Sequence, residues 1–476
     1  MCKKFFLKTL DIGHGPLDTA LRHKSANGTF SGEDMRGKHP PSNKTKSEDI
    51  DAVRKHIESF PTIESHYTRK DTRRRYLDQC LSISKMYRLY KEQCETSLPT
   101  KTPVHEKTYR RIFCNEYNLS FFHPKKDQCA KCNKNKQLKG EEKDKFQEEF
   151  AEHLRRKEEA QKAKAEDKER ASNNNDFVSA TFDMQSVLHI PHSPVSLMYY
   201  SRKLCAYNVC VYNATKPNDA FCYCWSEVDG GRGSNEIGTC LYDWLCQLPP
   251  HVTEVSLFSD TCSGQNRNQN IAAMFLYAVQ NTTLKTITHN FLESGHSYME
   301  CDSMHAAIEH EKKSTHVYTM LDWISIFRRA RHRNPYCIRN LHYQDFHNFK
   351  ELAQTLIKNK RIDEDGNIIN WLLVKSFKFE KDQSGVIMYR YNYTDTFMKL
   401  RVSGPGRPAK QKNLSCAYKG KIPISEAKKK DLINLCKKFV IPEEVHPWYE
   451  ALPTSKNVKD QVPEPSVEDS GDDDNE

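Results

Sequence analysis

Two aspartates stand where an acidic side chain is unexpected. Asp183 falls in an apolar stretch, 177–184, that predicts a β-strand, and Asp260 ends a second such stretch, 255–260. Aspartate is disfavoured in strands, and a buried carboxylate needs a partner or a metal ion. Carboxylate oxygens are ligands that Mg²⁺ and Mn²⁺ prefer. We therefore predict that both aspartates hold divalent cations; the simpler alternative for Asp260 is a turn residue that accepts backbone N–H bonds.

Three further acidic residues could complete such a site. Glu236 lies in the first turn of a helix expected at 234–247, and Asp302 lies just before a helix expected from about 303. Glu309 lies within that last helix and is the rival of Asp302 for the last acidic position. Each has a simpler explanation, because carboxylates also cap helix N-termini and offset the helix dipole. Acids on successive elements together favour a shared metal site.

The elements that carry these residues are expected in the order β-β-β-α-β-α-β-α. Apolar, β-branched and aromatic runs predict the strands, and a 3.6-residue period predicts the helices. The expected strands are 177–184, 198–213, 220–228, 255–260 and 285–292, and the expected helices are 234–247, 268–280 and the one from about 303.

This order resembles the ribonuclease-H-like superfamily, which includes DDE-type transposases, retroviral integrases and ribonuclease H. The resemblance implies an α/β fold with a mixed five-stranded sheet flanked by helices, in which the first and fourth strands are neighbours. Asp183 and Asp260 would then project side by side, and Glu236 and Asp302 would match the superfamily's helix-borne acids. His296, in the loop after the fifth strand, would match a mobile histidine of ribonuclease-H-type enzymes, although an ordinary hydrogen-bonded histidine is the simpler explanation.

The implied chemistry is phosphodiester cleavage and strand transfer. Two Mg²⁺ ions (or Mn²⁺) about 3.5–4 Å apart stabilise the attacking and leaving oxygens of an in-line displacement. Asp183, Asp260 and Asp302 would hold these ions.

Two longer motifs make the resemblance more specific. DTCSGQNRNQN (260–270) and SGHSYMECDSMHAAIE (294–309) resemble a set of transposon-derived eukaryotic proteins with an Asp-x-Cys-x-Gly-Gln-Asn motif and a Gly-His-Ser/Thr…Asp motif. Shorter stretches that also look like this set lie at 36–44, 60–70, 124–132, 232–237 and about 420–447. The resemblance implies a nuclear DDE/D transposase, or a domesticated remnant, that acts on double-stranded DNA. The start at Met1, without the expected preamble, leaves open a truncated or captured copy.

A CxxC motif, Cys129 to Cys132, is typical of a zinc knuckle in a reducing compartment. His153, on the helix that follows, is the expected third ligand. His123 or Cys114 would complete a structural Zn²⁺ site. The alternative, two unliganded cysteines in a loop, stays open because no second CxxC or HxxxH motif follows.

The region before this motif predicts three helices, at 47–59, 70–94 and 105–117. Basic residues lie on or beside them, which suits a helix-turn-helix contact with DNA as well as a merely soluble bundle. The candidate DNA-binding residues are Arg73, Arg74, Arg75, Arg110 and Arg111, with Arg407 in a Gly-Arg-Pro segment that resembles an AT-hook.

Composition divides the rest of the chain. Residues 141–171 are almost all charged or alanine, which predicts a long solvated helix held by i,i+4 ion pairs. The expected organisation is an extended leader (1–46), a helical DNA-binding domain (47–122), the zinc knuckle with the long helix (123–172), the catalytic domain (173–335), an α+β region (336–450) and a disordered acidic tail (451–476).

Bulk properties agree with a nucleic-acid partner. The net charge is +10 despite the acidic tail, which favours a polyanion. The 17 cysteines show no disulfide spacing, and no stretch approaches the roughly 20 apolar residues of a membrane span. The sequence leaves open whether the chain forms a homo-oligomer. It also leaves open two alternatives to the transposase: a non-catalytic DNA-binding protein, and a nuclease without strand transfer.

Overall fold

A mixed β-sheet organises the computed structural model, which describes residues 2–32, 45–64, 75–77, 81–97, 102–121, 129–216, 219–403, 413–458 and 460. The strands lie in the order β10 (Cys337–Asn340), β7 (Ala220–Ser226), β6 (Leu204–Asn213), β4 (Phe177–Met184), β8 (Glu254–Ser259), β9 (Thr286–Phe291), β11 (Ser376–Glu380), β12 (Val386–Arg390) and β13 (Met398–Arg401), with β5 (Leu188–Ile190) pairing with β6 off this path. The fold is therefore mixed α/β, as the sequence predicts.

Strand directions alternate in blocks. β6 runs antiparallel to β4 and β7, whereas β4, β8 and β9 are parallel to one another. β11, β12 and β13 continue antiparallel from β9, and β10 pairs parallel with β7. The five expected strands are present as β4, β6, β7, β8 and β9, but the sheet is larger than expected and has ten strands among the described residues. Residues expected in a separate C-terminal region pair instead with the exposed backbone groups of the two edge strands.

Both faces of the sheet are buried, so the central strands are apolar on alternate sides. In β6, Tyr207 and Val209 pack into one core, whereas Ala206 and Cys210 pack into another. We call the side covered by α8 (Ser234–Cys246), α9 (Gln269–Asn281) and α12 (Phe349–Leu356) the α9 face.

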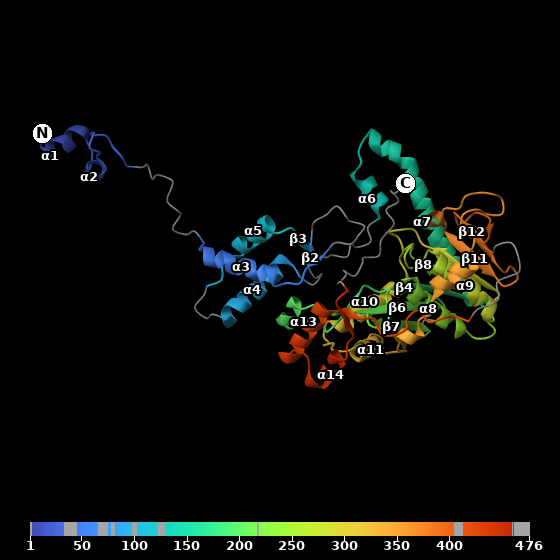
Figure 1. Ribbon diagram of the computed structural model, residues 1–476. Coiled ribbons are helices and arrows are strands. Elements are labelled where there is room, and N and C mark those ends of the chain that lie inside the picture. Colours follow the sequence, from blue (N-terminus) through green and yellow to red (C-terminus); the bar gives the residue numbers. More distant parts are fainter. Residues whose placement is uncertain are drawn as a thin grey trace.

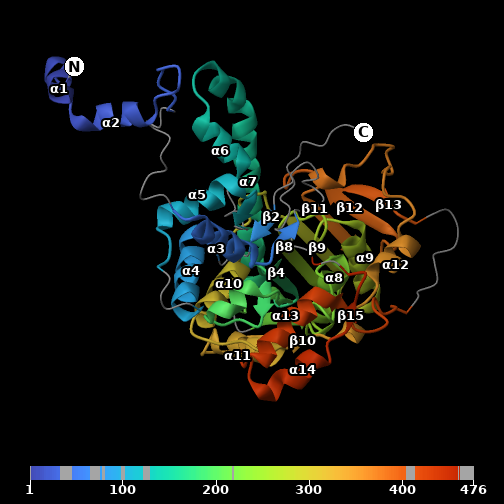
Figure 2. The same ribbon diagram turned by 60° about the vertical axis from the view of Figure 1, so that its left-hand side comes forward.

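The opposite side, the α10 face, is covered by α10 (Glu300–Lys312), α11 (Met320–Arg329), α13 (Glu426–Lys437) and α14 (His446–Glu450). Figures 1 and 2 show these helices on the two sides of the strands.

The long charged helix is α7 (Glu141–Asn173), and α6 (Ala130–Gln137) precedes it. Both views show α6 and the start of α7 standing clear of the sheet (Figures 1 and 2). Ion pairs such as Arg155–Glu159 form along the helix as predicted. One side of its second half is not solvated, however, because Ala160 packs in a cluster with Phe258 of the sheet and Asp167 accepts a hydrogen bond from Ser256. The helix is therefore part of the α10 face.

The N-terminal helical part differs from expectation in one element. It contains α3 (Ser47–Glu58), α4 (Ile83–Ser97) and α5 (Glu106–Glu116) around a small sheet of β1 (Ile63–Glu64), β2 (Arg75–Leu77) and β3 (Leu119–Phe121). The helix expected at 70–94 was wrong at 75–77, which forms β2 between β1 and β3. Inter-strand pairing overrides the local helical pattern there.

The two chain ends contain more regular structure than expected. The leader forms α1 (Lys3–Leu10) and α2 (His14–Arg22), so it is not mostly extended where described. The tail forms β15 (Thr454–Ser455), which pairs with β14 (Ile424–Ser425), and residues 461–476 lie outside the described residues. Short 3-10 helices occur at Ser196–Tyr200, Tyr343–Asp345, Trp371–Leu373 and Glu443–Val445. Among the described residues, no helix combines the length and apolar character that crossing a membrane requires.

Candidate metal centres

The α10 face brings two aspartates and a histidine together. Asp183, Asp302 and His305 each offer a ligand atom, and these three atoms lie within 4.8 Å of one another. The His305 Nδ1 atom is 3.9 Å from the Asp183 Oδ2 atom. All three side chains are partly exposed, so a hydrated cation can reach them. We call this set the acidic cluster.

Strand register explains why Asp183 faces α10. Val178, Ala180 and Phe182 of β4 are buried in the core of the α9 face, so the alternate residues, including Asp183, face α10. Thr181 confirms this side, because its hydroxyl lies 3.6 Å from the Cys301 thiol of α10.

The same register relates Asp183 to Asp260. Thr181 pairs with Phe258 across the parallel strands β4 and β8. Asp183 lies two residues after Thr181, and Asp260 lies two residues after Phe258. Asp183 therefore faces α10, and the same alternation, continued one residue past the end of β8 at Ser259, directs Asp260 to that side. Asp260 is nevertheless not a member of the cluster of three. Its Oδ1 atom accepts hydrogen bonds from the Cys262 backbone N–H, at 3.2 Å, and from the Asn266 amide, which is the turn role considered above.

Helix α10 presents its polar residues at helical spacing. Asp302, His305 and Glu309 are separated by three and four residues, so they share one side of the helix. Asp302 also stabilises the helix start, because its Oδ2 atom accepts the Met299 backbone N–H at 2.8 Å. Asp302 lies inside the first turn of α10, whereas the sequence had predicted a position just before the helix.

Glu309, the rival last acid, lies about two turns further along α10. It accepts a hydrogen bond from Gln185, at 3.3 Å, and pairs with Lys312, at 2.9 Å. The structure thus places Asp302, and not Glu309, in the acidic cluster.

Glu236 is engaged elsewhere. Its Oε2 atom accepts the Gly233 backbone N–H at 2.8 Å, and its Oε1 atom accepts the Tyr418 hydroxyl. The residue is buried, with 3% of its surface exposed. Both oxygens therefore have protein partners, and Glu236 is not in the acidic cluster.

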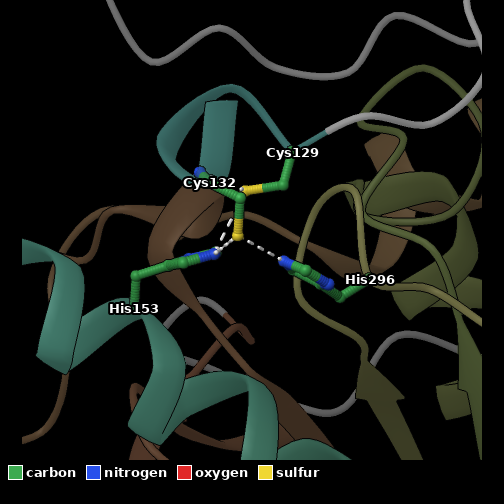
Figure 3. Close-up of side chains that lie close together, drawn as sticks. All are labelled: Cys129, Cys132, His153 and His296. Atoms are coloured by element: carbon green, nitrogen blue, oxygen red, sulfur yellow. Dashed lines mark hydrogen bonds between the residues drawn. The ribbon is translucent and has the colours of Figure 1, made fainter. Parts of the chain in front are cut away.

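His296 lies in a second group and not beside the aspartates. Cys129, Cys132, His153 and His296 offer ligand atoms within 4.8 Å of one another, and Figure 3 shows the four side chains pointing toward a common centre. The Cys129 thiol is 3.1 Å from the Nε2 atom of His153, and the Cys132 thiol is 3.2 Å from that of His296. We call this set the Cys/His cluster. Of the expected fourth ligands, Cys114 is exposed on α5 and is not in this group, and His123 lies outside the described residues.

Charged side chains surround the Cys/His cluster. The Nδ1 atom of His153 lies 3.4 Å from Glu293, whose other oxygen pairs with Lys375 at 2.7 Å. Burial lowers the pKa of His153 and of His296, and burial raises the pKa of the Cys132 thiol. Lowered pKa values leave the imidazoles neutral near pH 7, and neutral imidazole is the form that binds metals.

The predicted DNA-binding arginines are only partly described. Arg75, Arg110 and Arg111 are exposed, the first on β2 and the others on α5. Arg73, Arg74 and Arg407 lie outside the described residues.

Two functional candidates were missed as site residues. His305 carried a signal, since it follows Asp302 by three residues on one helix face. Glu293 carried none, because its approach to His153 depends on how α7 crosses the sheet.

Comparison with known proteins places part of the chain beside a protein family. A family model described as a domain of unknown function (DUF7869) is similar to residues 214–395, which run from the end of β6 to just beyond β12. This stretch contains Asp260, Asp302 and His305 but neither Asp183 nor the CxxC motif. No curated protein and no solved structure matches the chain.

Proposed function

We propose that this chain is a transposase-derived nuclear enzyme with a ribonuclease-H-like core that cleaves and joins DNA phosphodiesters with Mg²⁺ or Mn²⁺. One observation carries the proposal. Asp302 and His305 of helix α10 lie beside Asp183 on the α10 face of the sheet. The register of the parallel strands β4 and β8 directs Asp260 to the same face. The strand order β7-β6-β4-β8-β9, with β4 beside β8, also matches the arrangement that the superfamily resemblance implies.

The donor chemistry fits a divalent cation. Carboxylate oxygens suit Mg²⁺ and Mn²⁺, and these ions keep several waters, which the partial exposure of the acidic cluster allows. The His305 ring lies between the Asp183 carboxylate, whose Oδ2 atom is 3.9 Å from the His305 Nδ1 atom, and the buried Cys210 thiol, with which the His305 side chain interacts.

Each residue has a separate task in this proposal. Asp183 is fixed by its pairing with Cys210 of β6 and would hold one ligand position. Asp260, just after β8, is held by Cys262 and Asn266 and would supply a second carboxylate. Asp302 uses one oxygen to cap α10 and leaves the other for a cation. His305 accepts a proton or completes the ligand set. The bound divalent ions supply charge stabilisation for the attacking and leaving oxygens of the phosphodiester.

Recognition of the DNA belongs to other parts of the chain. The exposed Arg75, Arg110 and Arg111 are available to contact phosphates on the helical N-terminal part. The net charge of +10 supports a polyanionic partner.

Nicking of supercoiled DNA by the full chain in Mn²⁺ or Mg²⁺ tests the proposal. We expect Asp183→Asn, Asp260→Asn and Asp302→Asn each to lower the rate by roughly 100-fold or more, because each removes a ligand charge. Asp176→Asn is the matched control, since Asp176 is exposed and immediately precedes β4. Equal rates in wild type and all variants would contradict the proposal.

A non-catalytic DNA-binding protein is the second candidate. It is favoured by the hydrogen bonds that give Asp260 and Asp302 structural roles in a turn and a helix start. If the chain is non-catalytic, calorimetric titration with Mn²⁺ should give the same result for wild type and Asp183→Asn, because no ion binds at the acidic cluster. If nicking is seen, comparing a labelled RNA–DNA hybrid with duplex DNA ends separates a simple nuclease from a strand-transfer enzyme.

A further inference from the structure

The Cys/His cluster has the donor set of a structural zinc site. It joins two thiols and two imidazoles, a combination found in closed tetrahedral Zn²⁺ centres. Zinc bonds of about 2.3 Å to sulfur and about 2.0 Å to nitrogen place S and N ligands about 3.5 Å apart at a tetrahedral angle. The measured S–N separations are 3.1 Å for Cys129–His153, 3.6 Å for Cys132–His153 and 3.2 Å for Cys132–His296.

A second, independent feature orients one of the ligands. The Nδ1 atom of His153 faces the Glu293 carboxylate at 3.4 Å, so the Nδ1–H donates there and the Nε2 lone pair points to the two thiols. Glu293 is itself fixed by Lys375. A carboxylate behind a metal-binding histidine is the usual outer partner in zinc proteins.

Close backbone contact provides a third argument. Gly295 has a φ of +72°, and a Cβ atom at this position would lie 2.6 Å from the Cys129 Cα atom. The loop that carries His296 is therefore seated directly on the CxxC turn. A side chain on residue 295 would separate the two halves of the cluster.

We propose that Cys129, Cys132, His153 and His296 bind one zinc ion that ties α6 and α7 to the loop between β9 and α10. His296 lies 164 residues after Cys132 in the sequence, so the ion closes a long-range cross-link. Thiolate and imidazole ligands favour Zn²⁺ over Mg²⁺ or Ca²⁺.

The same loop leads directly into α10. Gln161 and Lys164 of α7 donate to the backbone oxygens of His296 and Tyr298, at 3.2 and 3.1 Å. The Thr261 hydroxyl, next to Asp260, lies 3.3 Å from that of Ser294. The zinc ion therefore supports the segment from which α10 begins, whether or not the acidic cluster is catalytic.

Metal content of the purified full chain tests the assignment. We expect one zinc per chain by elemental analysis, and replacement by Co²⁺ should give thiolate charge-transfer bands and tetrahedral d–d bands. Cys129→Ser and His296→Ala should each weaken Co²⁺ affinity at least tenfold. Cys114→Ser and His123→Ala, which remove the other two candidate fourth ligands, should leave stoichiometry and spectrum unchanged.

His296→Cys distinguishes the loss of a metal ligand from a failure of the variant to fold. A third thiolate should retain the ion and strengthen the charge-transfer bands. Absence of zinc and of Co²⁺ binding in wild type, unchanged affinity in His296→Ala, or loss of the ion in His296→Cys would each overturn the proposal. None of these measurements involves nucleic acid, so their outcome is independent of the nicking assay.

Discussion

Gly295 shows how a single residue can decide whether two distant segments meet. Its positive φ is a conformation that residues with a Cβ adopt only at a cost, and the space that a Cβ would need is occupied by the Cys129 backbone. The obstacle is main chain and not a flexible side chain, so rotamer changes cannot relieve it. Gly295 therefore has a steric reason to be glycine.

Replacement of this glycine gives a prediction at the residue scale. Gly295→Ala should lower zinc affinity at least tenfold, because the left-handed conformation alone costs about 1–2 kcal/mol for alanine and the overlap with Cys129 adds to it. Competition with a chromophoric chelator measures the change. Gly420→Ala is the control, since nothing lies within 4 Å of the position where its Cβ would be. Equal affinities in the two variants would show that the loop adapts freely.

At the scale of elements, the start of α8 depends on a carboxylate that first suggested catalysis. Glu236 joins the Gly233 backbone to the Tyr418 hydroxyl, so it connects the helix to a segment more than 180 residues later. Burial is the main reason that the pKa of Tyr418 is raised, and Glu236 raises it further. The bond thus has a neutral donor and a carboxylate acceptor, which is a strong combination.

A double-mutant cycle tests this interpretation. Glu236→Gln and Tyr418→Phe should each lower the free energy of unfolding by about 1–3 kcal/mol, and their combined effect should fall short of the sum. Urea unfolding of the four proteins measures the coupling. Gln247→Ala, at an exposed position just after the same helix, serves as a comparison and should add to Tyr418→Phe without coupling. Purely additive effects of Glu236 and Tyr418 would refute the structural role.

At the scale of the whole molecule, the N-terminal helical part is joined to the sheet through a buried histidine. The two ring nitrogens of His56 lie 2.8 Å from the Tyr109 hydroxyl and 2.9 Å from that of Tyr200. Tyr200 belongs to the segment between β5 and β6, and its ring packs against Phe60. A neutral imidazole donates to one tyrosine and accepts from the other, whereas a protonated ring has only donors.

This junction predicts acid sensitivity. Burial lowers the pKa of His56 to about 4, below its ordinary value of 6.5, so the unfolded part binds the proton more tightly. Stability should therefore be unaffected above about pH 7, fall as the pH drops below 6.5, and stop falling near pH 4. The loss at pH 5 should be about 2 kcal/mol, from 1.36 kcal/mol per pKa unit.

Hydrogen exchange of the α3 amides, corrected for the intrinsic effect of pH, measures this loss. The His56→Gln variant should be less stable at pH 8 but should lose the additional decrease at pH 5. His23→Gln, at an exposed position on α2's C-terminal side, should behave as wild type. An α3 equally protected at both pH values would contradict the prediction.

The sequence by itself determined the local elements and the candidate chemistry of several residues. Apolar runs predicted β4 and β8, because buried parallel strands need them, and the charged run predicted α7, because ion pairs along a helix are local. Asp183, Asp302, the CxxC pair and His153 could be selected for the same reason: residue type and short spacing already restrict their chemistry.

Only the tertiary structure decided which residues share a site. His296 joins the cysteines and not the aspartates, and Glu236 binds Tyr418. Strands β10 to β13, all after residue 335, extend the large sheet. These partners lie tens to hundreds of residues apart, and their meeting depends on the crossing of α7 over the sheet and on which strand edge is free. The periodicity of a sequence predicts neither the crossing of α7 nor the free strand edge, because a periodic pattern describes one helix or strand and does not specify which other element packs against it.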